Sequence, residues 1–289
     1  MTQGLRQADI DVLIQTRDEE KNLPFALESV RGWARRVFVV DSGSTDRTRE
    51  IAAEMGATVV EQAWLGYAAQ KNWALDNLPF EASWIFILDA DEVILPELRD
   101  ELLAIAGRPL DQTPQTAFNI NRYFIFLGKR IRHCGFYPSW NIRFFKRGQA
   151  RYEVREVHEH MLVEGEVGYL RGHMEHNDRR GLEFYMAKHN RYSTLEAREI
   201  YRVIKGESQA KYEAKFFGDA QQRNRWIKQH IYPKLPAKWL ARFVWMYVIK
   251  LGFLDGLAGL RFSLFMSAYE LLIGLKLAEL RQDESHPLA

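Results

Sequence analysis

Residues 84–92 read Trp-Ile-Phe-Ile-Leu-Asp-Ala-Asp-Glu, and this stretch decides the fold class. Its apolar part has the length and composition of a strand buried on both faces, as strands of parallel sheets are. Asp89 and Asp91 follow the apolar run at positions i and i+2, and Glu92 comes next. The carboxyl end of such a strand opens into the crevice where open α/β sheets bind ligands. The stretch therefore predicts an α/β fold with an acidic site at the edge of its sheet.

The three carboxylates allow two interpretations. Burying them unpaired would cost several kcal/mol, because the charges repel one another and lose their hydration. A hard divalent cation that carries a nucleotide diphosphate would remove this cost. The alternative is structural, with the Asp pair capping a helix that begins near Pro96. We favour the ligand site, and the rest of the sequence bears on the choice.

Strand and helix patterns alternate through the first third of the chain. Predicted strands lie at 11–15, 37–40, 57–60 and 84–88, and predicted helices at 22–33, 46–55 and 68–78. This βαβα order predicts a doubly wound, mostly parallel, Rossmann-like sheet. From residue 118 the pattern changes to that of a mixed sheet, with strands near 118–124, 142–145 and 168–170. Residues 182–205 and most of the chain after residue 211 then read as helical.

Polar segments follow the predicted strands on the same edge of the sheet as the Asp pair. They are Thr16-Arg-Asp-Glu-Glu20 after the first strand, Asp41-Ser-Gly-Ser-Thr-Asp46 after the second, and Gln70-Lys-Asn72 in the helix before the fourth. The second segment can turn tightly and present backbone N–H groups at a helix start. Asp41 could accept a hydrogen bond from a base or a ribose, and Lys71 could neutralise a phosphate. Each segment alone is also compatible with an ordinary capped turn.

Taken together, these motifs resemble those of glycosyltransferase family 2, inverting enzymes of the GT-A fold that use nucleotide-diphosphate sugars. The pattern is most similar to the bacterial branch that adds glucose or another hexose to the lipopolysaccharide core. Later segments agree with that branch: Trp140-Asn-Ile-Arg-Phe-Phe145, Val157-His-Glu159 and Gly252-Phe-Leu-Asp-Gly256. One departure is Asp18, where the family usually has Asn, and either residue can cap the loop. The resemblance covers residues 9 to 280, approximately.

The resemblance implies a role for each matching residue. Thr16, Glu19 and Asp41 would contact the nucleoside, Lys71 the base or the diphosphate, and Asp89 the ribose. Asp91 would coordinate Mg²⁺ or Mn²⁺ bridging the diphosphate of a UDP-sugar, and the metal would stabilise the leaving group. Residues 1–205 would form the catalytic domain, with a nucleotide-sugar half (1–117) and an acceptor half (118–205). Residues 206–289 would be a helical, basic and aromatic extension.

Inversion also needs a base that takes the proton of the acceptor hydroxyl as it attacks. Residues 153–160 read Glu-Val-Arg-Glu-Val-His-Glu-His and are the richest source of such groups after the Asp pair. Glu159 matches the family's Val-His-Glu position, so we expect it to be the base, with His158 orienting it or touching the acceptor. Glu156 is the reserve candidate. The alternative is an exposed strand edge with alternating charges.

Histidines in the second half could bind a metal. His158-x-His160 and His173-x-x-His176 have spacings seen in zinc sites, but no cysteine cluster accompanies them, so we do not expect structural zinc. Some GT-A enzymes use a late histidine as a ligand of the catalytic metal. His176 is the candidate for that position here.

Composition limits the class of protein. Residues 1–120 hold 11 Lys and Arg against 20 Asp and Glu, a net charge of −9, whereas residues 198–250 hold 12 against 4, a net charge of +8. The one cysteine, Cys134, excludes an internal disulfide. It could act as a nucleophile with His133 beside it, but we expect a buried or inert thiol. Residues 1–11 have no apolar core and therefore no signal peptide is expected. Charges interrupt the apolar region 239–277, so no transmembrane helix is expected either.

The basic, aromatic segment after residue 211 is typical of a surface that meets anionic lipid. A helix packed on the catalytic domain, or a nucleic-acid surface, would have a similar composition. A lipid-linked glycan acceptor explains the charge more economically, so we expect contact with an anionic membrane and no nucleic acid. The predicted location is the cytoplasm, at the inner face of the bacterial inner membrane.

The predicted function is transfer of a hexose, glucose by resemblance, from a UDP-sugar to a lipid-linked acceptor such as the lipopolysaccharide inner core. The alternatives are transfer to another surface polysaccharide or lipid carrier, and a non-catalytic peripheral membrane protein with a vestigial nucleotide site. A dehydrogenase is disfavoured because no Gly-x-Gly-x-x-Gly follows the first strand. A phosphatase of the Asp-x-Asp type would need Thr where Val93 stands, and a nucleotidyltransferase would need a glycine-rich loop at 16–20.

Overall fold

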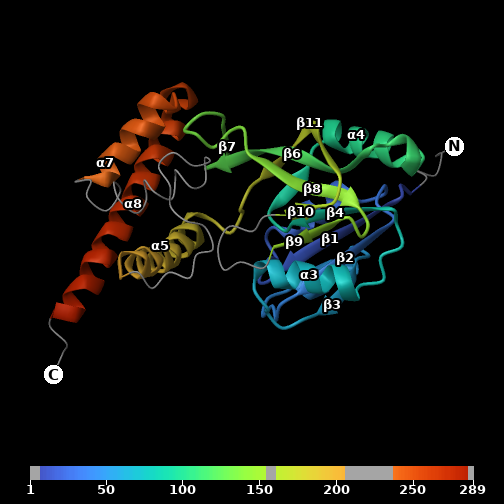
Figure 1. Cartoon of the computed structure of the whole chain (residues 1–289), viewed down its shortest axis with the longest axis horizontal. Coiled ribbons are helices and arrows are strands. Elements are labelled where there is room, and N and C mark those ends of the chain that lie inside the picture. The colour runs from blue at the N-terminus through green and yellow to red at the C-terminus, as the bar shows by residue number, and fades with distance from the viewer. Residues whose placement is uncertain (1–6, 154–160, 206–236, 286–289) are drawn as a thin grey trace. The chain divides into compact units, whose positions relative to one another are not determined.

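The computed structural model describes residues 7–153, 161–205 and 237–285. They form two compact units, one within Met1–Arg130 and Phe136–Arg180, the other within Ile131–Gly135 and Gly181–Ala289. Figure 1 traces both units in chain order. The helix predicted at 182–205 is α5 (Leu182–Lys205), and it belongs to the second unit. The domain boundary expected at residue 205 stays a prediction.

The first unit is built on a nine-stranded mixed sheet with the order β3-β2-β1-β4-β8-β6-β11-β5, and β7 pairs with β6. Strands β3, β2, β1 and β4 run parallel, as the sequence predicts. Beyond β4 the sheet becomes mixed, because β8 lies antiparallel to both β4 and β6. The strands are β1 (Ile10–Thr16), β2 (Arg36–Asp41), β3 (Thr58–Glu61), β4 (Trp84–Asp89), β5 (Glu92–Ile94), β6 (Gln115–Phe126), β7 (Lys129–Ile131), β8 (Trp140–Lys146) and β11 (Glu166–His176).

Helices cover both faces of this sheet, which explains why β4 is apolar without interruption. Trp84, Phe86 and Leu88 face the core formed with α1 (Leu23–Val30), α2 (Thr48–Glu54) and α4 (Pro96–Ala106). Ile85 and Ile87 face the opposite core, formed with α3 (Tyr67–Asn77). A short 3-10 turn, η1 (Leu110–Gln112), leads from α4 into β6. Two further strands, β9 (Ala150–Tyr152) and β10 (Met161–Val163), form a separate antiparallel pair.

The helix-cap interpretation of the Asp pair is wrong. Strand β5 lies between the pair and α4, and the residue before the helix is Leu95, which makes no side-chain cap. The helix predicted at 46–55 also differs at its start. That helix begins at Thr48, whose backbone N–H donates to Asp46 Oδ1 at 3.0 Å.

The second unit is helical in its described part. It contains α5, α7 (Lys238–Phe243), the π-helix η3 (Val244–Ile249), the 3-10 helix η4 (Gly252–Asp255) and α8 (Gly256–Ser285). Ala197 of α5 packs against Ile273 and Leu277 of α8. Lys276 Nζ joins the same helices by donating to the Asn190 carbonyl at 2.6 Å. Cys134 is buried as expected, and burial raises the pKa of its thiol.

One helical segment, Gly252–Gln282, is long and apolar enough to cross a membrane by length and composition, with 33% of its most apolar window buried. The sequence expectation differs here, because the charges in this region are spaced widely enough to leave 18 residues with at most two of them. A partly buried helix of a soluble protein passes the same test, so the finding concerns length and composition alone.

Gly172 of β11 sets how closely α4 approaches the sheet. A Cβ at this position would lie 2.3 Å from Leu98 Cα and 2.5 Å from Leu98 N, both backbone atoms of α4. Replacing Gly172 by Ala is expected to lower the free energy of unfolding by about 2–3 kcal/mol, because neither backbone can yield cheaply. Urea denaturation followed by circular dichroism measures this loss.

The control is Gly274→Ala in α8, where an added Cβ meets no atom within 4 Å. It should raise the free energy of unfolding by about 0.5–1 kcal/mol through helix propensity. Equal stability of the Gly172→Ala protein and the wild type would contradict the close packing of α4 on β11.

Candidate functional site

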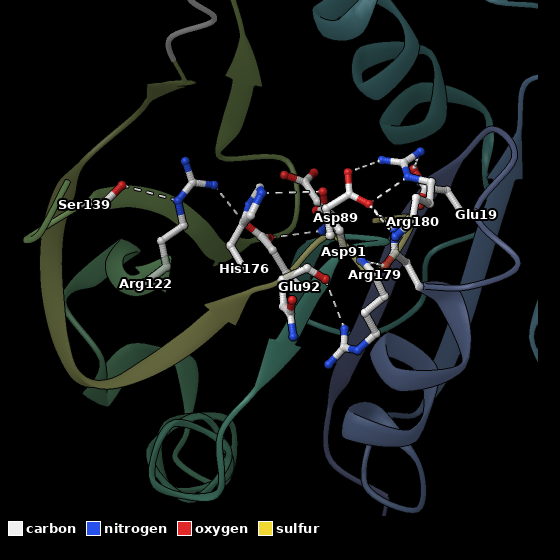
Figure 2. A network of polar contacts seen from close by, with 12 residues as sticks. Glu19, Asp89, Asp91, Glu92, Arg122, Ser139, His176, Arg179 and Arg180 are labelled. Atoms are coloured by element: carbon white, nitrogen blue, oxygen red, sulfur yellow. Dashed lines mark hydrogen bonds and ion pairs between the residues drawn. The ribbon is translucent and has the colours of Figure 1, made fainter. Parts of the chain in front are cut away.

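The three carboxylates of the quoted stretch lie together at the turn between β4 and β5 (Figure 2). Asp89 ends β4 with 34% of its side chain exposed, and Asp91 lies in the turn with 10% exposed. Glu92 begins β5 and is fully buried. Its Oε2 accepts the backbone N–H of Asp89 at 3.1 Å, which closes the turn. The acidic group predicted at the sheet edge is therefore present as one cluster.

Two arginines balance this cluster. Arg143 of β8 holds Asp89 with both terminal nitrogens, Nη1 at 3.3 Å and Nη2 in a short contact, and Nη2 also donates to Glu92 at 3.1 Å. Arg122 of β6 donates from Nη1 to the same Glu92 oxygen at 2.9 Å. Burial would raise the pKa of Asp89, but Arg143, Lys71 and Arg122 together hold this pKa well below its usual range. Asp89 therefore stays ionised as a carboxylate at neutral pH.

Arg143 is a site residue that reasoning on the sequence missed. It stands in the Trp-Asn-Ile-Arg-Phe-Phe segment, between the apolar residues Ile142 and Phe144. Its side chain is 7% exposed. Charged residues are rarely buried without a partner, so an arginine inside a predicted core strand was the available signal.

The structure brings Asp91 and His176 together, as a shared metal site requires. His176 ends β11, which pairs antiparallel with β5 so that His176 lies opposite Glu92. Its Nε2 is 3.5 Å from Asp91 Oδ2, and its buried Nδ1 has no hydrogen-bond partner among the residues that the structure describes. His173 points to the other face of β11, where its ring stacks on Tyr123 at 4.4 Å, so the two histidines of this motif do not form a zinc pair.

The donor set fits a divalent cation that is shared with a ligand. Carboxylates are preferred ligands of Mg²⁺ and Mn²⁺, and an imidazole suits first-row transition metals. Asp91 and His176 would leave most coordination positions of such an ion for other groups. No cluster of three or more His, Cys, Asp or Glu side chains suited to a metal occurs among the residues that the structure describes. Asp91 and His176 offer two ligand side chains, and the oxygens of a diphosphate could supply further ligands.

The loop after β2 is organised by Asp41. This buried carboxylate accepts hydrogen bonds from Thr16 Oγ1 at 3.0 Å, from Ser44 Oγ, and from the backbone N–H groups of Gly43 at 3.1 Å and Ser44 at 2.9 Å. These bonds hold the loop after β2 against the end of β1. Thr16 and Asp41 thus lie side by side, and their contact with a nucleoside stays a prediction. Asp18 caps the same loop, since its Oδ1 accepts the Thr45 N–H at 2.7 Å.

Asn22 fastens the loop after β1 to the loop after β11, a role that the sequence did not reveal. Its Nδ2 donates to Glu19 at 2.8 Å and to Asp178 at 3.1 Å, and its Oδ1 accepts the Arg179 N–H at 2.7 Å. Arg180 bridges the same acids, 2.8 Å from Glu19 and 2.7 Å from Asp178. The loop that leaves His176 is thereby tied to the loop that carries Glu19.

Glu19 responds to this setting with a changed acidity. Burial raises the pKa of Glu19 to about 7, and the nearby Asp91 and Asp178 charges act in the same direction. The ion pair with Arg180 and the hydrogen bond from Asn22 oppose this rise without cancelling it. Glu19 therefore exchanges its proton near neutral pH, at the side of the cluster where a nucleoside contact is predicted.

Lys71 lies within electrostatic reach of Asp89, as its effect on the pKa of that residue shows. It is buried, and its Nζ stands 4.7 Å from the centre of the Tyr152 ring. The neighbouring Asn72 fixes this part of α3 by exchanging two hydrogen bonds with the Tyr152 backbone, at 2.8 and 2.9 Å. The predicted base Glu159, its partner His158 and the reserve Glu156 lie outside the described residues, so their roles stay predictions.

Comparisons with known proteins agree with this geometry. Residues 11–175, more than half of the chain, match the family described as glycosyl transferase family 2. An uncharacterised glycosyltransferase of Rickettsia typhi is 28% identical over 202 residues, which cover 67% of this chain and 68% of that protein. One from Rickettsia bellii is 43% identical over 93 residues, covering 32% of this chain and 31% of the relative's length.

Among solved structures, the mannosyltransferase PcManGT of Pyrobaculum calidifontis, in complex with GDP-Man and Mn²⁺, has a TM-score of 0.51 at 18% identity. The match covers 94% of this chain and 88% of that one. At this identity the likeness concerns the fold. It supports the GT-A type assigned from the sequence.

The Arg143–Asp89–Glu92 contact generates a stability prediction. Replacing Arg143 by Ala leaves the buried Glu92 with Arg122 alone and Asp89 with no direct cation, so the free energy of unfolding should fall by about 3 kcal/mol. The control is Arg151→Ala, which removes an exposed pair with Asp76 and should cost at most about 1 kcal/mol. Chemical denaturation of both variants checks this, and equal losses would contradict the balancing role of Arg143.

Proposed function

Since the chain belongs to glycosyltransferase family 2, we propose that it transfers a hexose from a UDP-sugar to a lipid-linked glycan, with inversion at the anomeric carbon. The proposed hexose is glucose, and the proposed acceptor is the lipopolysaccharide inner core. Family membership supplies the reaction class, glycosyl transfer. The donor, the acceptor and the stereochemistry are the proposal.

A single observation carries the proposal: Asp91 and His176 face one another beside a carboxylate, Asp89, that arginine keeps charged. Asp91 and His176 would hold Mg²⁺ or Mn²⁺, which when bound offsets the negative charge that develops on the nucleotide as it leaves. The ionised Asp89 carboxylate would accept hydrogen bonds from ribose hydroxyls. Lys71 would add positive charge on the diphosphate side.

The remaining step needs a proton acceptor for the attacking hydroxyl. We assign this role to Glu159, with His158 orienting it, on the family pattern Val-His-Glu. A carboxylate placed within hydrogen-bond reach of the acceptor would take the proton as the new bond to C1 forms. No covalent intermediate is required for inversion.

A lipid-linked acceptor would place the enzyme at a membrane. We propose a cytoplasmic location at the inner face of the bacterial inner membrane, with peripheral contact to anionic lipid. The charge distribution supports this, because residues 198–250 carry a net charge of +8.

The metal assignment predicts the effect of removing Asp91. Mutation of a residue that only contacts a metal ligand typically lowers activity by roughly 10–100-fold. Asp91→Asn alters a proposed ligand itself, so it should lower the Mn²⁺-dependent turnover of UDP-hexoses by more than this. The matched control is Asp100→Asn, an exposed residue of α4 that should retain wild-type turnover. Nucleotide release in a screen of UDP- and GDP-hexoses measures both. Full activity in the Asp91→Asn protein would overturn the proposed mechanism.

His176 should act on metal affinity more than on the catalysed step. In His176→Ala, the Mn²⁺ concentration for half-maximal activity should rise about tenfold or more, while activity at saturating Mn²⁺ is largely kept. His173→Ala, on the other face of β11, is the control and should leave the metal dependence unchanged. An unchanged Mn²⁺ requirement in His176→Ala would refute its assignment as a ligand.

A further inference from the structure

The segment that links α7 to α8, whose course is drawn in Figure 1, carries a group of exposed apolar side chains. Over residues 244–257, eight large apolar side chains are each more than 40% exposed. They are Val244, Trp245, Val248, Ile249, Leu251, Phe253, Leu254 and Leu257. We call this segment the apolar tip. Soluble surfaces seldom carry so dense a group, and such patches mark sites of contact with a partner or a membrane.

The apolar tip is a built structure, because its inner side is closely packed. Met246 and Gly252 are fully or almost fully buried. A Cβ on Gly252 would lie 2.7 Å from both Cys134 Sγ and the Met246 carbonyl oxygen, so only glycine fits there. The Lys250 carbonyl also accepts the Cys134 N–H at 3.0 Å. The exposed residues are therefore held outward by a folded scaffold.

The exposed charged side chains on the apolar tip and its flanks are all positive. Residues 238–269 contain four basic residues, Lys238, Arg242, Lys250 and Arg261, and one acid, Asp255. The Asp255 side chain is only 5% exposed and lies 2.8 Å from His133 Nδ1. It also accepts the backbone N–H groups of Arg132 at 3.1 Å and His133 at 2.8 Å. The Asp255 carboxylate thus binds buried partners within the second unit. The charged side chains that remain exposed on the apolar tip and its flanks are therefore positive.

Lys250 and Trp245 show how the two kinds of side chain combine. Lys250 Nζ lies 5.0 Å from the centre of the exposed Trp245 ring. Trp favours the level of lipid headgroups, and Lys reaches from an apolar surface toward phosphates. A second protein surface would need matching acids and apolar pockets, whereas an anionic bilayer supplies negative charge above a continuous apolar layer.

We propose that the apolar tip inserts into the headgroup and upper acyl region of an anionic bilayer. The inference rests on the proposed function, whose membrane contact it assigns to one element. The structure favours insertion of the tip over passage of α8 through the bilayer. The second half of α8 packs on α5 through Ile273 and Leu277, and Lys276 there donates to the Asn190 carbonyl and to Ser193 Oγ at 2.8 Å. Crossing would break these contacts.

The test uses the full chain and sedimentation or flotation with vesicles of phosphatidylcholine, with and without phosphatidylglycerol. Wild type should bind the mixed vesicles, and the double variant Ile249→Glu/Leu254→Glu should bind at least about 100-fold more weakly. The matched control is Leu195→Glu in α5, because Leu195 is exposed at 55%, close to the 57% of Ile249 and Leu254, and the change should leave binding unchanged. Lys250→Gln/Arg261→Gln should weaken binding about tenfold or more on the mixed vesicles alone.

A second readout separates this inference from the proposed function. Hydrolysis of UDP-glucose in the absence of lipid should be equal in wild type and Ile249→Glu/Leu254→Glu, since the variant leaves the donor site intact. If the wild-type protein does not hydrolyse UDP-glucose, this would contradict the proposed function but would not bear on membrane insertion of the apolar tip. Wild-type flotation of the double variant would overturn the inference. A second outcome would also overturn it: the wild type is a dimer, the double variant is a monomer, and both float equally. The apolar tip would then be an interface between two copies of the chain.

Discussion

Three carboxylates share one turn at the end of β4, and the repulsion between them has to be balanced before the sheet edge can form. Arg143 and Arg122 balance Asp89 and Glu92 from β8 and β6, whereas Asp91 faces His176 without a direct ion pair to arginine among the contacts described. Arginine thus pairs directly with two of the acids, whereas Arg179 and Arg180 act on Asp91 only through longer-range charge. The third is left for a cation that a diphosphate ligand would share.

This division of charge depends on the order of the strands. The switch from parallel to antiparallel pairing at β4 brings β8 next to the acidic turn, and the pairing of β5 with β11 sets His176 opposite Glu92. Asn22 and Arg180 then tie the loop after β11 to that after β1. A donor bound at this edge would touch loops from both halves of the first unit, so their mutual fixation preorganises the site.

The parallel half of the sheet was predictable because its strands are buried on both faces. Such strands need apolar residues at successive positions, as in the run Ile85–Leu88. The pairing of Asp91 with His176 was predictable only through family resemblance. Arg143 and Asn22 were missed because their partners lie 54 and 156 residues away, and neither residue type signals its partner locally. Strand β5 has three residues, too few for a periodic pattern, and exists through pairing with β11.

We propose that Asp91 and His176 form a metal site that a nucleoside diphosphate completes. Water-proton relaxation of Mn²⁺ solutions tests it most directly, because slow tumbling of protein-bound Mn²⁺ enhances the relaxation rate. Little enhancement is expected with protein alone. A large enhancement is expected when UDP or GDP is added, above that of the nucleotide and Mn²⁺ without protein. Strong enhancement before any nucleotide is present, or none after it is added, would contradict the claim.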